Sequence, residues 1–584
     1  MGDFLLVTHD AETEATPPAF TELRQAAARH GMAIQPLAPC AWLALSGPRP
    51  PKLVTVGGWM LIGDVFDRRP HGGSGIPVTD DDVAYERGIM KRFWGRYAGV
   101  RLNRKGQAEA VMRDPSGALE CITWSEAGLT FVASSTPDWL IRATRPDWRI
   151  NINRVADTLA DPLGSWARPL LDGPTALLPG TLQALPPDRP ATPLWTPDIF
   201  VRQGEQRPVS DEDAEASLRD AVDEAVAGFA RVSGALGAEV SGGLDSSIVA
   251  STTSRYPEAN VRLWLNAWGP DAEADERPYA EALATALDFR LTTVERSPAL
   301  ITSDMLADLT RGLRPGFNAL DGPNDDLLAR LWSAAGIDAV MTGKGGDAVF
   351  IQSATGDVVA DIWREHGWRS LLSPSLPELA RWNGRSVWSL IADARRSRSD
   401  PEHLGQRLSF LSPRASPPRH PWLEVCDDLG PAKRYQIAGV LNGVTFSGPS
   451  AQTAVADLLH PLLAQPVVEA CLSLPARQLT LGRRDRALAR HAFRDRLPAM
   501  IADRRSKGEM TAYYGRRIAA SLDVLRPWLL DGRLAAEGLI DRAAAETVLT
   551  EESLIWRGRF GEIMIAASLE AWVRAWEGRL STAP

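Results

Sequence analysis

The sequence predicts two fold classes in one chain, a strand-rich α+β part followed by an α/β part that continues into helices. Three observations support this prediction. Residues 1–150 hold short apolar segments separated by turn residues, residues 210–341 alternate between helical and strand patterns, and the pattern beyond residue 355 is mostly helical. Strands that alternate with helices form a parallel, doubly wound sheet, whose ligands bind at the carboxyl ends of the strands.

The N-terminal part is expected to consist of short strands bounded by turn residues. These strands are predicted at 4–7, 42–46, 53–56, 60–62, 99–102, 108–113 and 129–133. Proline becomes frequent between residues 172 and 208, which indicates a boundary or an ordered crossing segment. We therefore expect one domain over residues 1–205 and a second over residues 206–584.

The second part begins with a predicted amphipathic helix that Ser210 can cap. Its apolar residues recur on one face, at Ala214, Leu218, Val222, Ala225, Val226 and Phe229. The elements expected after it are a strand and glycine loop at 238–247, a helix to about 255, a strand at 261–267, a helix at 276–287, and strands at 291–294 and 338–341. Two glycine-rich loops therefore fall at the carboxyl ends of strands.

The composition is that of an ordinary soluble globular protein, with 44% hydrophobic and 23% charged residues over 584 positions. A formal net charge of −9 argues against a nucleic-acid surface. The four cysteines are widely spaced with no C-x-x-C, which argues against a disulfide framework or a structural zinc site. Neither a secretory signal nor an apolar run of bilayer length is recognisable, so we expect the ATP-rich cytoplasm, with no membrane partner.

Residues 241–247, Ser-Gly-Gly-Leu-Asp-Ser-Ser, form the most specific motif in the chain. The adjacent glycines let the backbone turn tightly and approach a ligand, while the hydroxyls of Ser241, Ser246 and Ser247 and the following helix N-terminus favour an anion. Asp245 would repel phosphate by itself, so we interpret it as a Mg²⁺ ligand that bridges to phosphate oxygens. The competing interpretation is a plain Gly/Ser turn. The motif is neither a G-x-x-x-x-G-K-[ST] loop nor a dinucleotide fingerprint.

The second glycine loop is Thr-Gly-Lys-Gly-Gly-Asp at residues 342–347. Adjacent strand ends would bring Asp347 near Asp245, and two carboxylates make a Mg²⁺ site beside a triphosphate. Lys344 is a candidate phosphate contact. The competing interpretations are a glycine turn with a surface aspartate and a surface lysine.

A third segment, residues 504–509, carries three cations in four positions. One interpretation is a solvated basic loop. The other is that Lys507 stabilises charge at a tetrahedral centre or a leaving phosphate, an effect worth ~10²–10³ in rate.

Together these motifs resemble the asparagine synthetase superfamily, and the similarity covers nearly the whole chain. The resemblance implies that Asp245 and Asp347 hold Mg²⁺, that Lys507 is catalytic, and that backbone near Val240 and Leu265 holds adenine. It also implies that ATP phosphates lie against the two loops, through Ser241, Gly242, Gly243, Asp245, Ser246, Gly343 and Gly345.

The N-terminal part resembles the glutaminase domain of this superfamily. The segments at 93–99, 113–117 and 132–134 follow the order found in that domain, a sandwich of two antiparallel sheets between helices. Its nucleophile is a cysteine directly after the initiator methionine, where this chain has Gly2. The resemblance therefore implies an inactive glutaminase domain, which excludes ordinary glutamine-dependent asparagine synthesis.

Superfamily members without that cysteine include β-lactam synthetases and the macrolactam synthetases of lasso-peptide biosynthesis. The segments at 460–472, 484–493 and 505–508 resemble the lasso cyclases. Lys344 stands where β-lactam synthetases carry a tyrosine, which argues against their tyrosine-based proton relay.

The resemblance thus implies an ATP-dependent, AMP-forming ligase. It would adenylate an Asp or Glu side chain of a precursor peptide and close the ring with the peptide's N-terminal amine. The expected partners are that peptide, a leader peptidase and a leader-recognition protein, with no nucleic acid.

The base that deprotonates the amine is not identified. Asp321, Asn324 and Asp325 lie where the superfamily places part of its acceptor pocket, although a simple loop is the stronger interpretation. His460 is interpreted as a buried, hydrogen-bonded residue at a helix start.

Two alternatives remain open. One is a small-molecule amide synthetase, either ammonia-dependent or of the β-lactam type. The other is a catalytically dead scaffold that binds peptide.

Overall fold

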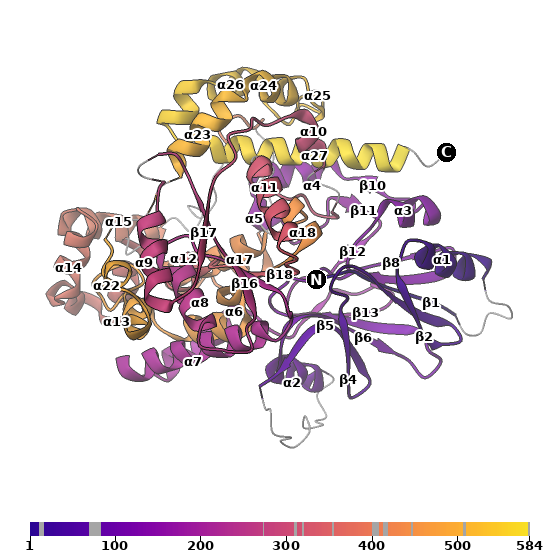
Figure 1. Ribbon diagram of the computed structural model, residues 1–584, viewed down its shortest axis with the longest axis horizontal. Helices are drawn as coiled ribbons and strands as arrows, with labels where there is room; N and C mark the ends of the chain where they lie inside the picture. The colour runs from indigo at the N-terminus through magenta and orange to yellow at the C-terminus, as the bar shows by residue number, and fades with distance from the viewer. Residues whose placement is uncertain are drawn as a thin grey trace.

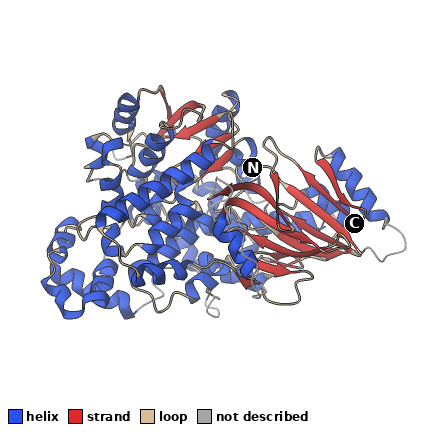
Figure 2. Ribbon diagram, turned by 90° about the horizontal axis from the view of Figure 1, so that it is seen from below, coloured by secondary structure: helices blue, strands red, loops and turns tan. Residues whose placement is uncertain are grey.

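The computed structural model has an N-terminal part with two antiparallel sheets and a C-terminal part with a parallel sheet among helices (Figures 1 and 2). This arrangement is the predicted combination of fold classes. The structure describes residues 1–10, 17–68, 83–271, 274–308, 312–317, 321–352, 356–399, 408–412, 419–445, 448–505, 508 and 510–581.

The first antiparallel sheet has the strand order β12-β8-β9-β1-β3-β2. Its strands are β1 (Phe4–His9), β2 (Ala33–Ala38), β3 (Ala41–Leu45), β8 (Ile122–Glu126), β9 (Leu129–Ala133) and β12 (Thr175–Ala176). All six residues of β1 are buried. This strand is central and covered on both faces, which explains its continuous apolar sequence.

The second antiparallel sheet has the order β14-β13-β7-β6-β5-β4. Its strands are β4 (Lys52–Val56), β5 (Trp59–Asp67), β6 (Phe93–Leu102), β7 (Ala108–Arg113), β13 (Thr181–Ala184) and β14 (Thr192–Pro193). Leu6 and Val132 of the first sheet share a buried core with Ile62, Val100 and Val111 of the second. The two sheets therefore form the expected sandwich.

Helices cover both outer faces of the sandwich. Helix α2 (Ala84–Arg92) packs on the second sheet, and α1 (Pro18–Arg29) and α3 (Asp138–Thr144) pack on the first. The last helix, α27 (Phe560–Ser581), also joins the core beside the first sheet (Figure 1). The chain end thus ties the helical part to the N-terminal sheets.

Strands β2 and β8, and the short strands β12 to β14, are not predicted from the sequence. Strand β2 contains Pro36 and lies at a sheet edge, where a missing N–H costs no ladder hydrogen bond, and half of its residues are exposed. Strand β8 has buried Ile122 and Trp124 at alternating positions, a signal that could have been used. The proline-rich stretch is an ordered crossing segment, because β13 within it pairs with β7.

Helix α7 (Asp211–Ala230) confirms the predicted amphipathic helix. The hydroxyl of Ser210 accepts the N–H of Asp213 at 3.1 Å, and three acidic residues follow in the first turn, where the helix dipole favours them. All six predicted apolar positions are buried.

The parallel sheet has the order β17-β16-β15-β18-β19. Its strands are β15 (Leu236–Glu239), β16 (Val261–Trp268), β17 (Leu291–Glu295), β18 (Ala339–Met341) and β19 (Asp457–Leu459). Its main covering helices are α8 (Leu244–Thr253), α9 (Arg277–Leu287) and α11 (Gly322–Ala334). The first four strands confirm the prediction. The sequence analysis misses β19, because this three-residue strand lies in an otherwise helical region and pairs only with a distant part of the chain.

The described residues from 356 onward are otherwise mostly helical, as predicted. Helix α12 (Gly346–Val349) lies just before this region. The helices within it include α13 (Gly356–His366), α14 (Ser375–Trp382), α15 (Val387–Ser399), α17 (Pro431–Thr445), α18 (Ala451–Val455), α19 (Gln465–Ser473), α21 (Ala487–Ala492), α23 (Thr511–Ala520), α24 (Leu522–Leu530) and α26 (Arg542–Val548). None of the helices searched in the described ranges has the length and apolar character needed to cross a bilayer.

Candidate active site

The first glycine loop joins the end of β15 to the start of α8. Gly242 has a φ of +87°, and a Cβ there would lie 2.6 Å from a carbonyl oxygen, so the position requires glycine. The hydroxyls of Ser241 and Ser246 lie 2.8 Å apart, and the Ser241 hydroxyl accepts the N–H of Gly243. Ser247 is fully buried and donates its hydroxyl to the Gly243 carbonyl at 2.7 Å. The prediction that Ser247 contributes to the anion site is therefore wrong, because its hydroxyl is used in the first turn of α8.

The second glycine loop packs directly on the first, because β18 is the hydrogen-bonded neighbour of β15. A Cβ on Gly343 would lie 2.4 Å from the backbone nitrogen of Ser246. A Cβ on Gly346 would lie 2.4 Å from the carboxyl carbon of Asp245. Both positions therefore need glycine so that the two loops can touch.

Asp245 and Asp347 meet at one guanidinium group. Nη1 of Arg486 lies 2.9 Å from Asp245 Oδ2 and 2.7 Å from Asp347 Oδ1. Nε of Arg486 donates to Asp485 Oδ2 at 3.0 Å. The sequence analysis predicts the approach of the two aspartates but misses Arg486. Its only local signal is a run of four charged residues at 483–486.

The two aspartates fit a Mg²⁺ ion that is shared with phosphate. Their carboxylates both lie within hydrogen-bond distance of one nitrogen, so one cation can interact with both. In the described part of the chain, no three His, Cys, Asp or Glu side chains are grouped so that they could hold a metal ion. Mg²⁺ is commonly held by one or two carboxylates together with substrate phosphates. The donor set therefore suits an ion that arrives with a nucleotide.

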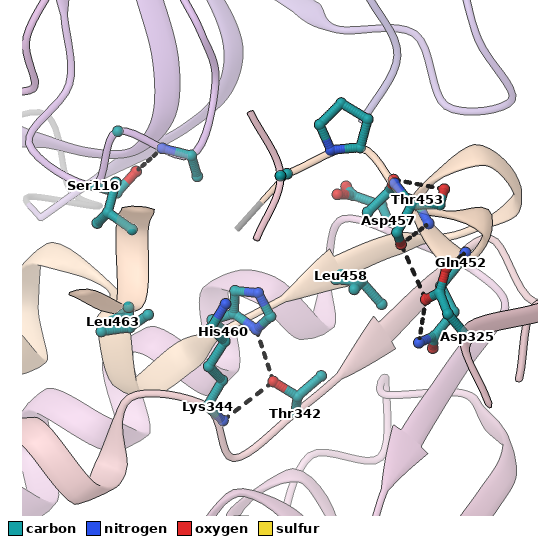
Figure 3. Close-up of a pocket in the computed structure, with 18 of the residues that line it drawn as sticks. Ser116, Asp325, Thr342, Lys344, Gln452, Thr453, Asp457, Leu458, His460 and Leu463 are labelled. Atoms are coloured by element: carbon teal, nitrogen blue, oxygen red, sulfur yellow. Dashed lines mark hydrogen bonds between the residues drawn. The ribbon is translucent and has the colours of Figure 1, made fainter. Parts of the chain in front are cut away.

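A cavity of about 1300 Å³ connects these loops to the N-terminal sheets. Residues 116–120 and 134–139 line it from the N-terminal part, and Tyr514, Phe560 and Met564 line it from the C-terminal helices. Figure 3 shows part of its wall around the second loop.

The predicted ATP-binding residues divide into two groups. Those that line the cavity are Ser241, Gly243, Asp245, Ser246 and Gly343, whereas Gly242, Gly345, Val240 and Leu265 do not line it. The N–H of Val240 donates to the Leu265 carbonyl at 2.8 Å, and the Asn266 side chain donates to the Val240 carbonyl at 2.7 Å. Adenine contacts at these strand ends stay a prediction.

Lys344 lines the cavity, and burial lowers the pKa of its ammonium group to about 8, while the charge of Glu239 acts in the opposite direction. Its backbone N–H donates to Thr342 Oγ1 at 3.2 Å, and that hydroxyl lies 2.7 Å from His460 Nδ1 (Figure 3). Burial, together with the charge of Lys344, lowers the pKa of His460 well below its ordinary value. His460 is therefore a neutral, hydrogen-bonded residue before a 3₁₀ turn, as predicted.

An ion-pair network links β19 to the N-terminal sheets. We call Arg49, Asp64, Arg96 and Asp457 the interdomain clamp. Arg96 donates to both carboxylate oxygens of Asp457 at 2.7 Å, and Arg49 Nε donates to Asp457 Oδ2 at 3.1 Å. Arg49 also pairs with Asp64 at 2.6 Å. Burial opposes ionisation, but the two guanidinium groups hold the pKa of Asp457 well below its usual range. Because β19 leads into His460, the clamp fixes the strand that supports the second loop.

The three predicted acceptor-pocket residues differ in role. Asp325 lines the cavity, but its carboxylate accepts N–H groups at the start of α18 and the Gln452 side-chain amide at 2.9 Å, which gives it a structural role (Figure 3). Asn324 is 2% exposed and does not line the cavity. Asp321 does line it, and accepts the Tyr514 hydroxyl at 3.2 Å and Arg296 Nη1 at 3.5 Å. The sequence analysis misses both of these partners.

Lys507 lies outside the described residues, so its catalytic role stays a prediction. Two described residues near it, Arg504 and Gly508, both contact Glu276, which lines the cavity. Arg504 Nη1 lies 2.6 Å from Glu276 Oε1, and the N–H of Gly508 donates to the same oxygen at 3.1 Å. Arg504 also stacks over the Tyr279 ring at 3.8 Å.

The cysteines provide no activated thiol. Cys40, Cys121, Cys426 and Cys471 are all buried and unpaired with one another, and burial raises the pKa of each thiol. At Gly2 a Cβ would lie 1.7 Å from the carbonyl oxygen of Ser46, so the backbone leaves no room for a side chain there.

A model of the protein family described as asparagine synthase matches residues 217–574. The match includes both glycine loops, Arg486 and the segment around residue 507. A search of curated proteins finds no match to the chain.

Proposed function

The chain belongs to the asparagine synthase family of ATP-dependent amide ligases, and within that family we propose that it is a lasso-peptide macrolactam synthetase. The proposed substrate is a ribosomal precursor peptide, and the product is a ring closed by an isopeptide bond. The carboxylate of an Asp or Glu side chain attacks the α-phosphate of ATP, which gives an acyl-adenylate and pyrophosphate. The peptide's N-terminal amine then attacks the acyl carbon, and AMP leaves.

The size and position of the cavity support a peptide substrate. Pockets that bury a drug-sized ligand typically measure about 300–1,000 Å³. At about 1300 Å³ the cavity is larger, and it extends from the nucleotide loops to the N-terminal sheets. A peptide that reacts with itself needs this space, because two separate parts of one chain must meet at the acyl carbon. Holding them together contributes up to ~7–11 kcal/mol to lowering the barrier.

Each part of the site has a role in this scheme. The nest of Ser241 and Ser246 at the start of α8 would bind phosphate oxygens. Asp245 and Asp347 would hold Mg²⁺, which neutralises phosphate charge when bound. Arg486 and Lys344 would add positive charge toward the leaving group. The walls of the cavity would limit access of water to the adenylate. The buried cysteines support an internal amine rather than ammonia released from glutamine.

A leader peptidase and a leader-recognition protein would deliver the linear peptide in the cytoplasm, where ATP is abundant.

The decisive test is incubation of the protein with ATP, Mg²⁺ and a leader-cleaved precursor peptide, followed by mass spectrometry. We expect loss of one water, a blocked N-terminus and one AMP per ring. An N-acetylated peptide is the control and should not cyclise. Unchanged peptide mass together with ammonia-dependent AMP formation would instead support a small-molecule amide synthetase. No ATP cleavage with any carboxylate would support a binding scaffold.

Replacing Lys344 by Gln should lower kcat/KM by ~10²-fold and remove the alkaline limb of the pH profile. The ammonium group is charged below its pKa of about 8, so its stabilisation of anionic phosphate is present at neutral pH and lost as pH rises through that value. Lys52→Gln, at an exposed position of β4, is the matched control. An alkaline limb that persists unchanged in the variant would refute this role.

A further inference from the structure

Glu239 ends β15 and lines the cavity between the two glycine loops. Its neighbours Ala238 and Val240 are buried in the core that contains α8. Because side chains alternate along a strand, Glu239 faces the other side of the sheet, toward α11. The register pairs Ala238 with Met341, so the next residues, Glu239 and Thr342, emerge side by side at the strand ends. Lys344 follows two positions later.

The surroundings of Glu239 combine burial with charges of both signs. Burial raises the pKa of this carboxyl to about 7, with Asp325 and Asp321 acting in the same direction and Arg296 and Lys344 acting against it. In the described part of the chain, its carboxylate takes part in no hydrogen bond or ion pair. A carboxylate that faces a cavity without such a partner is available to a ligand.

The attacking amine needs a proton acceptor, and five other titratable groups near the two glycine loops already have hydrogen-bond or ion-pair partners. Asp245 and Asp347 pair with Arg486, and Asp325 caps α18. Asp321 already accepts two donors, from Tyr514 and Arg296. The ring of His460 is hydrogen-bonded to Thr342.

We propose that Glu239 is the general base that takes the proton of the attacking amine, an inference that rests on the proposed amide-forming function. The neutral amine nitrogen forms a bond to the acyl carbon, and one N–H proton passes to a carboxylate oxygen of Glu239. The bond between the acyl carbon and the adenylate oxygen then breaks, and AMP leaves with the electron pair. Lys344 lies on the same side and stabilises the negative charge that develops on the leaving group.

The test separates adenylation from amide formation in Glu239→Gln. The first half-reaction is followed by pyrophosphate release and by trapping of the acyl-adenylate as a hydroxamate. Hydroxylamine is a suitable trap, because it is unprotonated at neutral pH and needs no base. Amide formation is followed with whichever amine the wild type uses, the peptide's own or added ammonium. We expect hydroxamate within about threefold of wild type, and amide formation lower by ~10²–10⁴-fold.

The pH profile gives a second signature. In the wild type the rate of amide formation should rise through pH ~7, because the base form of Glu239 is populated only above its pKa of about 7. Glu239→Gln should lose this acid limb. The groups that face Glu239 and affect its titration are Arg296, Asp321, Asp325 and Lys344.

Glu295→Gln is the matched control, because Glu295 also ends a strand of the same sheet but is exposed and does not line the cavity. Wild-type amide formation in Glu239→Gln, or an equal loss of hydroxamate and amide, would overturn the role of Glu239. Failure of the proposed peptide function has a different signature. The wild type would then join only free ammonia, and the same variant would still test the base with that nucleophile.

Discussion

Replacing Asp245 by Asn is expected to reduce ATP-dependent pyrophosphate release by about 10³-fold or more. Asp245 lies in the first turn of α8 and shares the guanidinium group of Arg486 with Asp347. The amide of Asn keeps the shape but removes the charge that holds a metal ion against phosphate. The measurement is the rate of pyrophosphate release at several Mg²⁺ concentrations. Asp347→Asn should show a loss of the same kind, with a raised Mg²⁺ requirement in both variants.

The control for this prediction separates catalysis from folding. Asp428→Asn removes a carboxylate that pairs with Arg202 at the surface, and it should leave ATP turnover unchanged. The thermal midpoint of Asp245→Asn should stay within a few degrees of wild type, because Arg486 keeps its bonds to Asp347 and Asp485. Normal turnover with a normal Mg²⁺ dependence would show that Asp245 is not a metal ligand.

Replacing Asp457 by Asn should lower the free energy of unfolding by about 3–5 kcal/mol, because it removes one of the two carboxylates that balance the buried guanidinium groups of Arg49 and Arg96, and Asp64 alone remains. Asp457 is 8% exposed and bonds both Arg49 and Arg96. Its depressed pKa means that the ionised clamp stabilises the protein fully at neutral pH. That stabilisation is lost as pH falls below ~4, where the carboxyl of the unfolded chain also protonates. Urea unfolding at pH 7 measures the effect of the substitution, and unfolding of the wild type at pH ~3 measures the loss on acidification, which develops below the unfolded-chain pKa of ~4.

The same surface variant serves as the reference for stability. Asp428 is 63% exposed in its pair with Arg202, and the loss of such a pair typically costs ~0–1 kcal/mol. A destabilisation of Asp457→Asn no larger than that of Asp428→Asn would contradict the clamp. We also expect slower amide formation in Asp457→Asn, because β19 positions His460 and, through Thr342, the second loop.

Local sequence patterns predict much of the fold. Helix α7 follows from one capping serine and an apolar stripe, and β15 to β18 follow from short apolar runs bounded by turns. These elements are encoded by neighbouring residues, so a single sequence contains the signal. Strand β19 is different, because its three residues are held in the sheet by pairing with β18, more than 100 positions earlier.

The candidate active site also combines features that the local sequence predicts with features that it does not predict. The glycine loops predict their own turns, and the adjacency of parallel strands predicts that Asp245 and Asp347 approach each other. Arg486 is 241 positions from Asp245, and Arg96 is 361 positions from Asp457. No local pattern connects such pairs.

The sequence by itself determined the two fold classes, the position of both glycine loops and the resemblance of these loops to those of the asparagine synthetase superfamily. Only the tertiary structure decided which residues share the cavity, that Arg486 joins the two aspartates, that the Ser247 hydroxyl and the Asp325 carboxylate are used in helix starts, and that Glu239 and Lys344 line the same cavity. The physical reason is that backbone conformation depends mainly on neighbouring residues, whereas burial, charge pairing and pKa depend on groups that are brought together by folding.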